Sequence, residues 1–185
     1  WLWGYVGFGD FDGAGGDDLV TTISGFQSSS AGPVVPSNAT VFLNSGTSPS
    51  TSGKEVGVWN FQGANYGNYI YSMIVGDCSD DGNDDIIVGT NYDLGGSYTD
   101  GMIWACIGLG SGNVKIPEMW YQTTGHWQPR DMVIGDFDVD AGTDIIPNYW
   151  FENAQPPATF VIDTYSFEFG SGRQTSPVPK FLKKW

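Results

Sequence analysis

Three short segments of this chain concentrate aspartate and glycine between apolar residues. They read GDFDGAGGDDLV from Gly9, GDCSDDGNDDIIV from Gly76 and GDFDVDAGTDIIP from Gly135. Thirteen of the chain's 21 acidic residues lie in these segments. Carboxylates held this close together repel one another unless a cation or open water compensates their charge. The chain therefore needs three similar turns that are either solvated or occupied by cations.

The oxygen-bearing residues recur at fixed positions, counted from the first aspartate of each segment. Positions one and nine hold an aspartate every time. Position three holds aspartate or serine, and position five holds aspartate in two of the three segments. Alternate residues of a tight turn can point oxygens at one centre, and hard oxygen ligands in a flexible loop suit Ca²⁺. The glutamate at position twelve and the flanking helices of an EF-hand are missing. The pattern predicts two to three Ca²⁺ sites. The residues at positions one, three, five and nine are Asp10, Asp12, Ala14 and Asp18; Asp77, Ser79, Asp81 and Asp85; and Asp136, Asp138, Asp140 and Asp144.

The apolar segments around each loop also repeat. A short strand pattern precedes the loop (YVGF, IYSMIV, DMVI), a second follows it at position nine, and two more complete the unit. The chain has 27 glycines and 10 prolines and no amphipathic window of helical period. We predict an all-β fold of three four-stranded antiparallel blades, residues 1–67, 68–128 and 129–185, with the acidic loop between the first and second strands. Pro147 is expected to make the third blade irregular in its second strand.

The segment FGDFDGAGGDDLV resembles the FG-GAP/VCBS repeat of integrin α-subunit propellers, bacterial extracellular proteins and some fungal lectins. The resemblance implies β-propeller blades, Ca²⁺ bound by the aspartates at the matching positions, and a place outside the cell or on its surface. It adds the backbone carbonyls of position seven, Gly16, Asn83 and Gly142, as ligands. Two departures are Ala14, which removes a carboxylate, and Ala141, which replaces the usual glycine. The first site is the one that the departure at Ala14 weakens.

Three blades cannot close around an axis, because closed propellers have four to eight. Open blade faces would be apolar patches that seek a partner. We expect that partner to be other copies of the chain or the remainder of a longer chain, packed into a ring or a filament. The aromatic strands in residues 1–8 and 178–185 are expected at the contact.

Charge and composition exclude several function classes. A net charge of −14 argues against nucleic acid and anionic membranes as partners, and no apolar run is long enough to insert into a membrane. The single histidine, His126, provides no zinc cluster or catalytic triad, and three equivalent carboxylate clusters are more than one active site needs. The sequence predicts a non-enzymatic extracellular calcium-binding structural or adhesive module that self-assembles. The alternatives are a glycan-binding, lectin-like propeller and a propeller segment of a larger secreted enzyme.

Two smaller features leave alternatives open. Cys78 and Cys106 could form a disulfide, or they could be a loop thiol and a buried thiol. Asn38 begins an Asn-Ala-Thr sequon, which is either a glycosylation site or a chance occurrence.

Overall fold

A computed structural model describes residues 4–14, 16–24, 26–27, 34–35, 37–44, 54–59, 68–92, 101–122, 127–136, 143–151, 163–168 and 178–184. These residues form fourteen strands with antiparallel pairing throughout, and no helix. The all-β, antiparallel prediction is confirmed. In this part of the chain no helix could cross a membrane.

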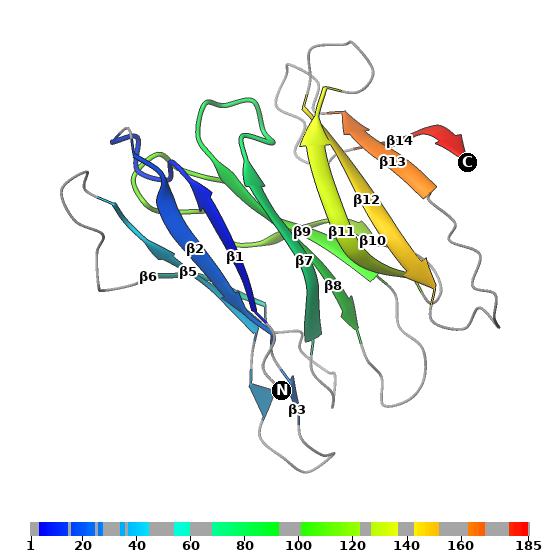
Figure 1. The fold of residues 1–185 in the computed structure, drawn as a ribbon, viewed down its shortest axis with the longest axis horizontal. Coiled ribbons are helices and arrows are strands. Elements are labelled where there is room, and N and C mark those ends of the chain that lie inside the picture. Colours follow the sequence, from blue (N-terminus) through cyan, green and yellow to red (C-terminus); the bar gives the residue numbers. More distant parts are fainter. Residues whose placement is uncertain are drawn as a thin grey trace.

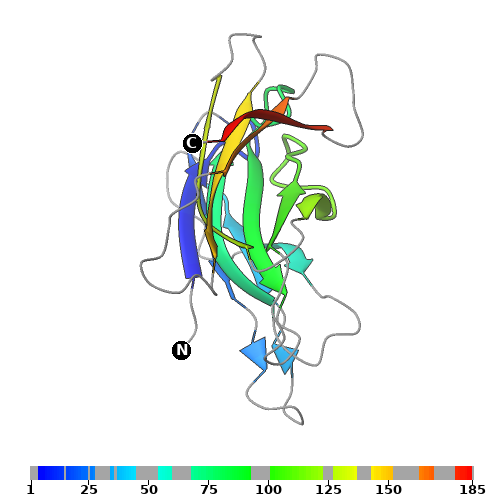
Figure 2. The ribbon, with the colours of Figure 1, turned by 90° about the vertical axis from the view of Figure 1, so that its right-hand side faces the viewer.

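The first unit is a four-stranded meander. Its strands are β1 (Gly4–Gly9), β2 (Asp18–Ile23), β5 (Ser37–Phe42) and β6 (Lys54–Trp59), hydrogen-bonded in that order. The pair Gly9 and Asp18 closes the ladder at the acidic loop. A small hairpin of β3 (Phe26–Gln27) and β4 (Val34–Val35) lies at the opposite end of the molecule (Figures 1 and 2).

The second unit repeats the same meander. It consists of β7 (Asn68–Gly76), β8 (Asp85–Tyr92), β9 (Gly101–Cys106) and β10 (Glu118–Gln122), again hydrogen-bonded in chain order. Gly76 pairs with Asp85 at the mouth of the second acidic loop, as Gly9 pairs with Asp18. The two units therefore share one topology and one loop position.

The third unit differs from the predicted four-stranded sheet. Its described strands form two hairpins, β11 (Trp127–Gly135) with β12 (Asp144–Phe151), and β13 (Asp163–Glu168) with β14 (Val178–Lys184). Strands β12 and β13 lie side by side, but no hydrogen-bonded ladder joins them among the described residues.

Pro147 does not interrupt the second strand of this unit, so that prediction is wrong. Strand β12 runs through Pro147, which is paired with Met132. A proline has no N–H to donate and is tolerated where the ladder on one side of a strand is missing, as it is between β12 and β13. The irregularity of the hairpin lies instead in β11, between Pro129 and Asp131.

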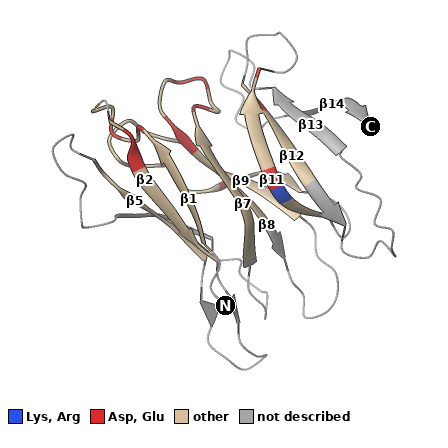
Figure 3. Cartoon of the chain, in the orientation of Figure 1, with Lys and Arg blue, Asp and Glu red and all other residues tan. Residues whose placement is uncertain are grey.

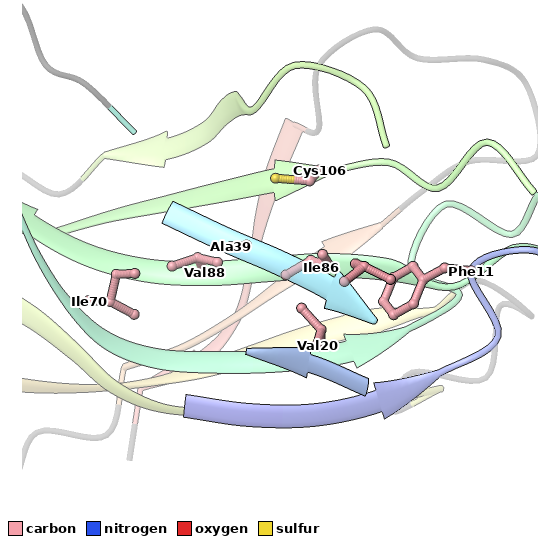
Figure 4. Close-up of a cluster of buried hydrophobic side chains, with 8 residues drawn as sticks. Phe11, Val20, Ala39, Ile70, Ile86, Val88 and Cys106 are labelled. Carbon is pink, nitrogen blue, oxygen red and sulfur yellow. The ribbon is translucent and has the colours of Figure 1, made fainter. Parts of the chain in front are cut away.

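The three units stand side by side, and their first strands β1, β7 and β11 are neighbours (Figure 1). One apolar core fills the space between the first and second units and includes Phe11, Val20 and Ile86 (Figure 4). A second core, with Ile87 and Ile145, fills the space between the second and third units. Neighbouring residues of β8 thus enter different cores, because successive side chains of a strand point to opposite faces.

Bulges in β7 and β11 fasten the units to one another. Tyr71 and Arg130 are the extra residues of these bulges, and each lies six positions before the first aspartate of its loop. The Tyr5 hydroxyl donates to the Tyr71 carbonyl, and the Ser72 hydroxyl donates to the Pro129 carbonyl at 2.7 Å. The Arg130 guanidinium lies 4.1 Å from the centre of the Tyr71 ring, a cation–π contact between units.

A glycine on β1 allows the first and second units to approach closely. A Cβ atom at Gly7 would lie 2.7 Å from Val75 Cγ2 and 3.0 Å from Met73 Cε. We predict that Gly7→Ala lowers the free energy of unfolding by about 1–3 kcal/mol through overpacking. Val75→Ala should also destabilise the protein, by leaving a cavity. The double variant should lose less than the two single variants together, because each change relieves the other. Urea unfolding of the four proteins measures this coupling, and strictly additive losses would contradict the stacking of these two units.

Candidate metal-binding loops

The acidic loops lie at one end of the sheets, where Asp and Glu residues gather (Figure 3). The first loop, residues 10–18, joins β1 to β2, and the second loop, residues 77–85, joins β7 to β8. The third loop, residues 136–144, joins β11 to β12. Each loop therefore occupies the same place in its unit.

The aspartate at position nine is buried in all three loops. Asp18, Asp85 and Asp144 are each 0% exposed. Asp18 Oδ2 accepts the backbone N–H of Phe11 at 2.9 Å, and Oδ1 accepts the backbone N–H of Asn44 at 2.6 Å. The carboxylate thus ties the start of the loop to Asn44, the second residue after the third strand.

Asp85 makes the same connection in the second unit. Its Oδ2 accepts the N–H groups of Cys78 at 3.0 Å and Ser79 at 2.8 Å, and its Oδ1 accepts that of Gly108 at 2.8 Å. Gly108 comes two residues after the end of β9, as Asn44 comes two residues after the end of β5. Hydrogen bonds from N–H groups to a charged acceptor are about twice as strong as neutral ones.

The first loop brings its three carboxylates together. Oxygen atoms of Asp10, Asp12 and Asp18 all lie within 4.8 Å of one another. Backbone N–H groups hold the two outer carboxylates: Gly13 donates to Asp10 Oδ1 at 2.7 Å, and Ala14 donates to Asp12 Oδ1 at 2.8 Å. Ala14 offers no side-chain oxygen. The loop that the resemblance marks as weakest is nevertheless the one in which three carboxylates converge.

In the second loop the carboxylates brace the turn. Asp77 accepts the N–H groups of Asp81 at 3.0 Å and Gly82 at 2.9 Å, one on each oxygen, and Asp81 in turn accepts that of Asn83 at 3.0 Å. Among the described residues, only the first loop brings oxygens of three carboxylates within 4.8 Å of one another.

The hydroxyl oxygen of Ser79, at position three of the second loop, is buried. It has no hydrogen-bond partner with acceptable geometry, although it is close enough to the Asp85 carboxylate to favour its ionised form. A buried hydroxyl without a hydrogen bond is costly. This oxygen occupies the position that the sequence assigns to a neutral metal ligand.

The remaining predicted ligands are less completely placed. Gly16 and Asn83, at position seven, lie within the first two loops. In the third loop Asp136 and the buried Asp144 are described, whereas Asp138, Asp140 and Gly142 lie outside the described residues.

Position four requires a left-handed backbone in both described loops. Gly13 has φ +72° and Asp80 has φ +54°, the only non-glycine residue with positive φ among those described. Aspartate tolerates this conformation better than most residues do. The two loops therefore share a left-handed residue at position four despite their different sequences.

Neighbouring loops also contact each other, which the sequence did not predict. Asp84 Oδ2, at position eight of the second loop, accepts the N–H of Asp10 in the first loop at 2.7 Å. Thr143, at position eight of the third loop, donates its hydroxyl to Asp80 Oδ1 at 2.9 Å. No sequence signal marks position eight, because its partner belongs to another repeat.

Sequence reasoning also missed position two. Phe11 and Cys78 are both 0% exposed and anchor their loops in the cores. An apolar residue recurs there in all three segments, the third being Phe137, so the repeat carried a readable signal.

The two cysteines are free thiols, so the disulfide alternative does not hold. Cys106 belongs to the core between the first and second units, and Cys78 belongs to the core between the second and third. Burial, followed by the charge of Asp85, raises the pKa of both thiols well above the ordinary value. Both are therefore inert at neutral pH.

The sequon residue Asn38 lies inside a sheet. It is half-buried in β5, paired with Ile23 of β2 on one side and Val58 of β6 on the other. Glycosylated asparagines lie on surface loops. This placement favours the chance reading of the sequon.

No protein-family model matches the chain, and no curated protein sequence is similar to it. The geometry of the loops is therefore the basis for the functional argument.

Burial raises the pKa of Asp85 to about 6, against the hydrogen bond from the Gly108 N–H, which lowers it. In metal-free buffer the folded protein should therefore hold this proton in a range where the unfolded chain has lost it. Because the folded protein binds this proton more tightly than the unfolded chain does, the proton adds to the unfolding free energy. The contribution is fully present below the ordinary pKa of 3.8 and is lost as the pH rises through 6. We predict that the unfolding free energy of the protein, minus that of Asp85→Asn, falls by about 2 kcal/mol between pH 4 and pH 7. Urea unfolding at each pH measures the difference. A constant or rising difference would contradict the assignment.

Proposed function

We propose that this chain is a non-enzymatic, calcium-binding structural module built from FG-GAP/VCBS-type blades, and that it works outside the cell. The observation that carries the proposal is the convergence of Asp10, Asp12 and Asp18 in the first loop. The oxygen of Ser79 in the second loop supports it independently.

The residues present fit a calcium ion. Two oxygens that each lie about 2.4 Å from one Ca²⁺ can be at most about 4.8 Å apart, and the three carboxylates of the first loop meet that limit. Without a cation, each pair of carboxylates at this separation repels by an amount on the order of 3 kcal/mol at an effective dielectric constant of about 20. A divalent cation between the carboxylates would attract each of them and so outweigh their mutual repulsion.

The loops would hold calcium through carboxylates, one hydroxyl and backbone carbonyls. Such hard, mixed oxygen ligands on a flexible turn favour Ca²⁺ over Mg²⁺, which demands a nearly ideal octahedron. In this proposal the ligands are Asp10, Asp12, Gly16 and Asp18; Asp77, Ser79, Asp81, Asn83 and Asp85; and Asp136, Asp138, Asp140, Gly142 and Asp144.

The role of the ion is mechanical. Calcium would lock each turn, and the position-nine aspartate would pass that rigidity to the third strand through Asn44 or Gly108. Contacts between loops, such as that of Asp84 with Asp10, would connect neighbouring sites. Extracellular calcium modules work with dissociation constants of about 10⁻⁴–10⁻³ M, which matches a scaffold or adhesive protein.

We predict that Ca²⁺ stabilises the protein. At a calcium concentration of about 100 times Kd, mass action adds about 2.7 kcal/mol per site, which raises the Tm of a domain of this size by about 5–10 °C. Asp12→Asn should reduce the calcium-dependent part of this shift, because it removes one of the three converging carboxylates. Differential scanning calorimetry with calcium and with chelator measures the effect.

Asp17→Asn is the matched control. Asp17 is an exposed aspartate of the same loop, lies outside the cluster and carries the same charge. The control should keep the calcium-dependent shift that Asp12→Asn loses. Equal Tm values with calcium and with chelator, together with no heat of calcium binding by titration calorimetry, would refute the calcium role.

A further inference from the structure

Among the residues that the structure describes, the first and third units each expose apolar side chains on one sheet face. In the second unit, we call the side that packs against the first unit the entry face and the side that packs against the third unit the exit face. The equivalent sides of the first and third units carry the same names. On the first unit, Val6, Phe8 and Ile23 are 63%, 64% and 43% exposed. On the third unit, Val133 is 51% exposed. The three exposed side chains of the first unit lie together on one sheet face, as at an interaction surface; on the third unit the exposed apolar side chain is Val133 alone among the described residues.

The first-unit residues belong to its entry face. Antiparallel partners share one side of a sheet, and the pairs are Val6 with Thr21, Phe8 with Leu19 and Gly4 with Ile23. The other side carries Tyr5 and Val20, which pack against the second unit. The exposed apolar residues therefore point away from the rest of the described chain.

The same positions are covered in the second unit. Counted back from the first aspartate of the loop, Val6 and Phe8 correspond to Met73 and Val75. Those two side chains pack into the core against the exit face of the first unit. An entry face of this kind is thus complementary to an exit face.

The third unit offers the corresponding exit face. Val133 pairs with Ile146, and it occupies the position of Ile74 in the second unit. Ile74 packs into the core between the second and third units. Val133 is therefore exposed at the position where the half-buried Ile74 of the second unit packs against a core.

We propose that a second copy of this chain docks head to tail, with the exit face of one copy on the entry face of the next. The inference rests on the proposed structural role, but the argument for the contact comes from the two interfaces within the chain. The surfaces involved are different, so the contact is heterologous and produces a closed ring or an open filament.

The proposed contact between copies would lack hydrogen bonds that the internal contacts have, and β1, unlike β7 and β11, has no bulge to accept one. Tyr5 and Ser72 each donate a hydrogen bond to a bulge carbonyl of the following unit. The third unit has Asp131 at that position, and a carboxylate cannot donate. The contact between copies lacks this hydrogen bond, so it should be weaker than the internal contacts and reversible on dilution.

Light scattering coupled to size exclusion tests the proposal on the 185-residue chain. The intact protein should form species of more than one copy at its highest soluble concentrations. Phe8→Asp and Val133→Asp each disable one face and should be monomeric. Ile116→Asp, at a residue that is 86% exposed and belongs to neither face, is the control and should assemble like the intact chain. Val6→Asp replaces Phe8→Asp if that variant does not fold, as judged by circular dichroism.

Mixing the two disabled variants gives the sharpest outcome. The exit face of the Phe8→Asp chain and the entry face of the Val133→Asp chain are both intact, so the mixture should form a dimer that grows no further. A mixture that stays monomeric, or an intact chain that stays monomeric, overturns the proposal. Each mass is measured with calcium and with chelator. Assembly that needs both faces but is indifferent to calcium would support this inference and count against the calcium role.

Discussion

The buried aspartate that ends each of the first two acidic loops holds its repeat together. Asp18 and Asp85 accept N–H groups from the start of their own loops and from the residues after the third strands. Without these carboxylates, the N–H groups would be left unpaired near the core, at a cost of about 1–3 kcal/mol each. One side chain thereby joins the first three strands of a unit at one end. The position of the acidic loop relative to these strands is fixed by the same hydrogen bonds.

Burial of the same aspartate makes its negative charge unfavourable. Burial raises the pKa of Asp85, which means that the folded protein resists holding a charge there. The aspartates that surround it add to the negative potential of this end of the molecule (Figure 3). In the proposed role, a cation compensates the charge that the backbone contacts require, so that structural and binding functions share one set of carboxylates.

Stacking of the units follows from strand geometry. Because side chains alternate along a strand, adjacent residues of β8 such as Ile86 and Ile87 enter cores on opposite sides of the middle unit. Glycines such as Gly7 permit the close approach, and the bulges at Tyr71 and Arg130 supply carbonyls and a cation–π contact between units. The outermost faces keep the same pattern without a neighbour, which is why their exposure carries an argument about assembly.

The sequence by itself determined the strands that flank the acidic loops, the positions of the loops and the candidate ligands, but not the β3–β4 hairpin. Strand β8 begins and ends where the pattern DIIVGTNY does, because alternation and turn residues are local properties. Only the tertiary structure decided which oxygens converge, which are used by the backbone, and that Asp84 and Thr143 reach into neighbouring loops. It also decided that Pro147 stays within a strand and that Cys78 and Cys106 enter different cores. Those outcomes depend on contacts between residues far apart in the chain, and periodicity and spacing carry no information about such contacts.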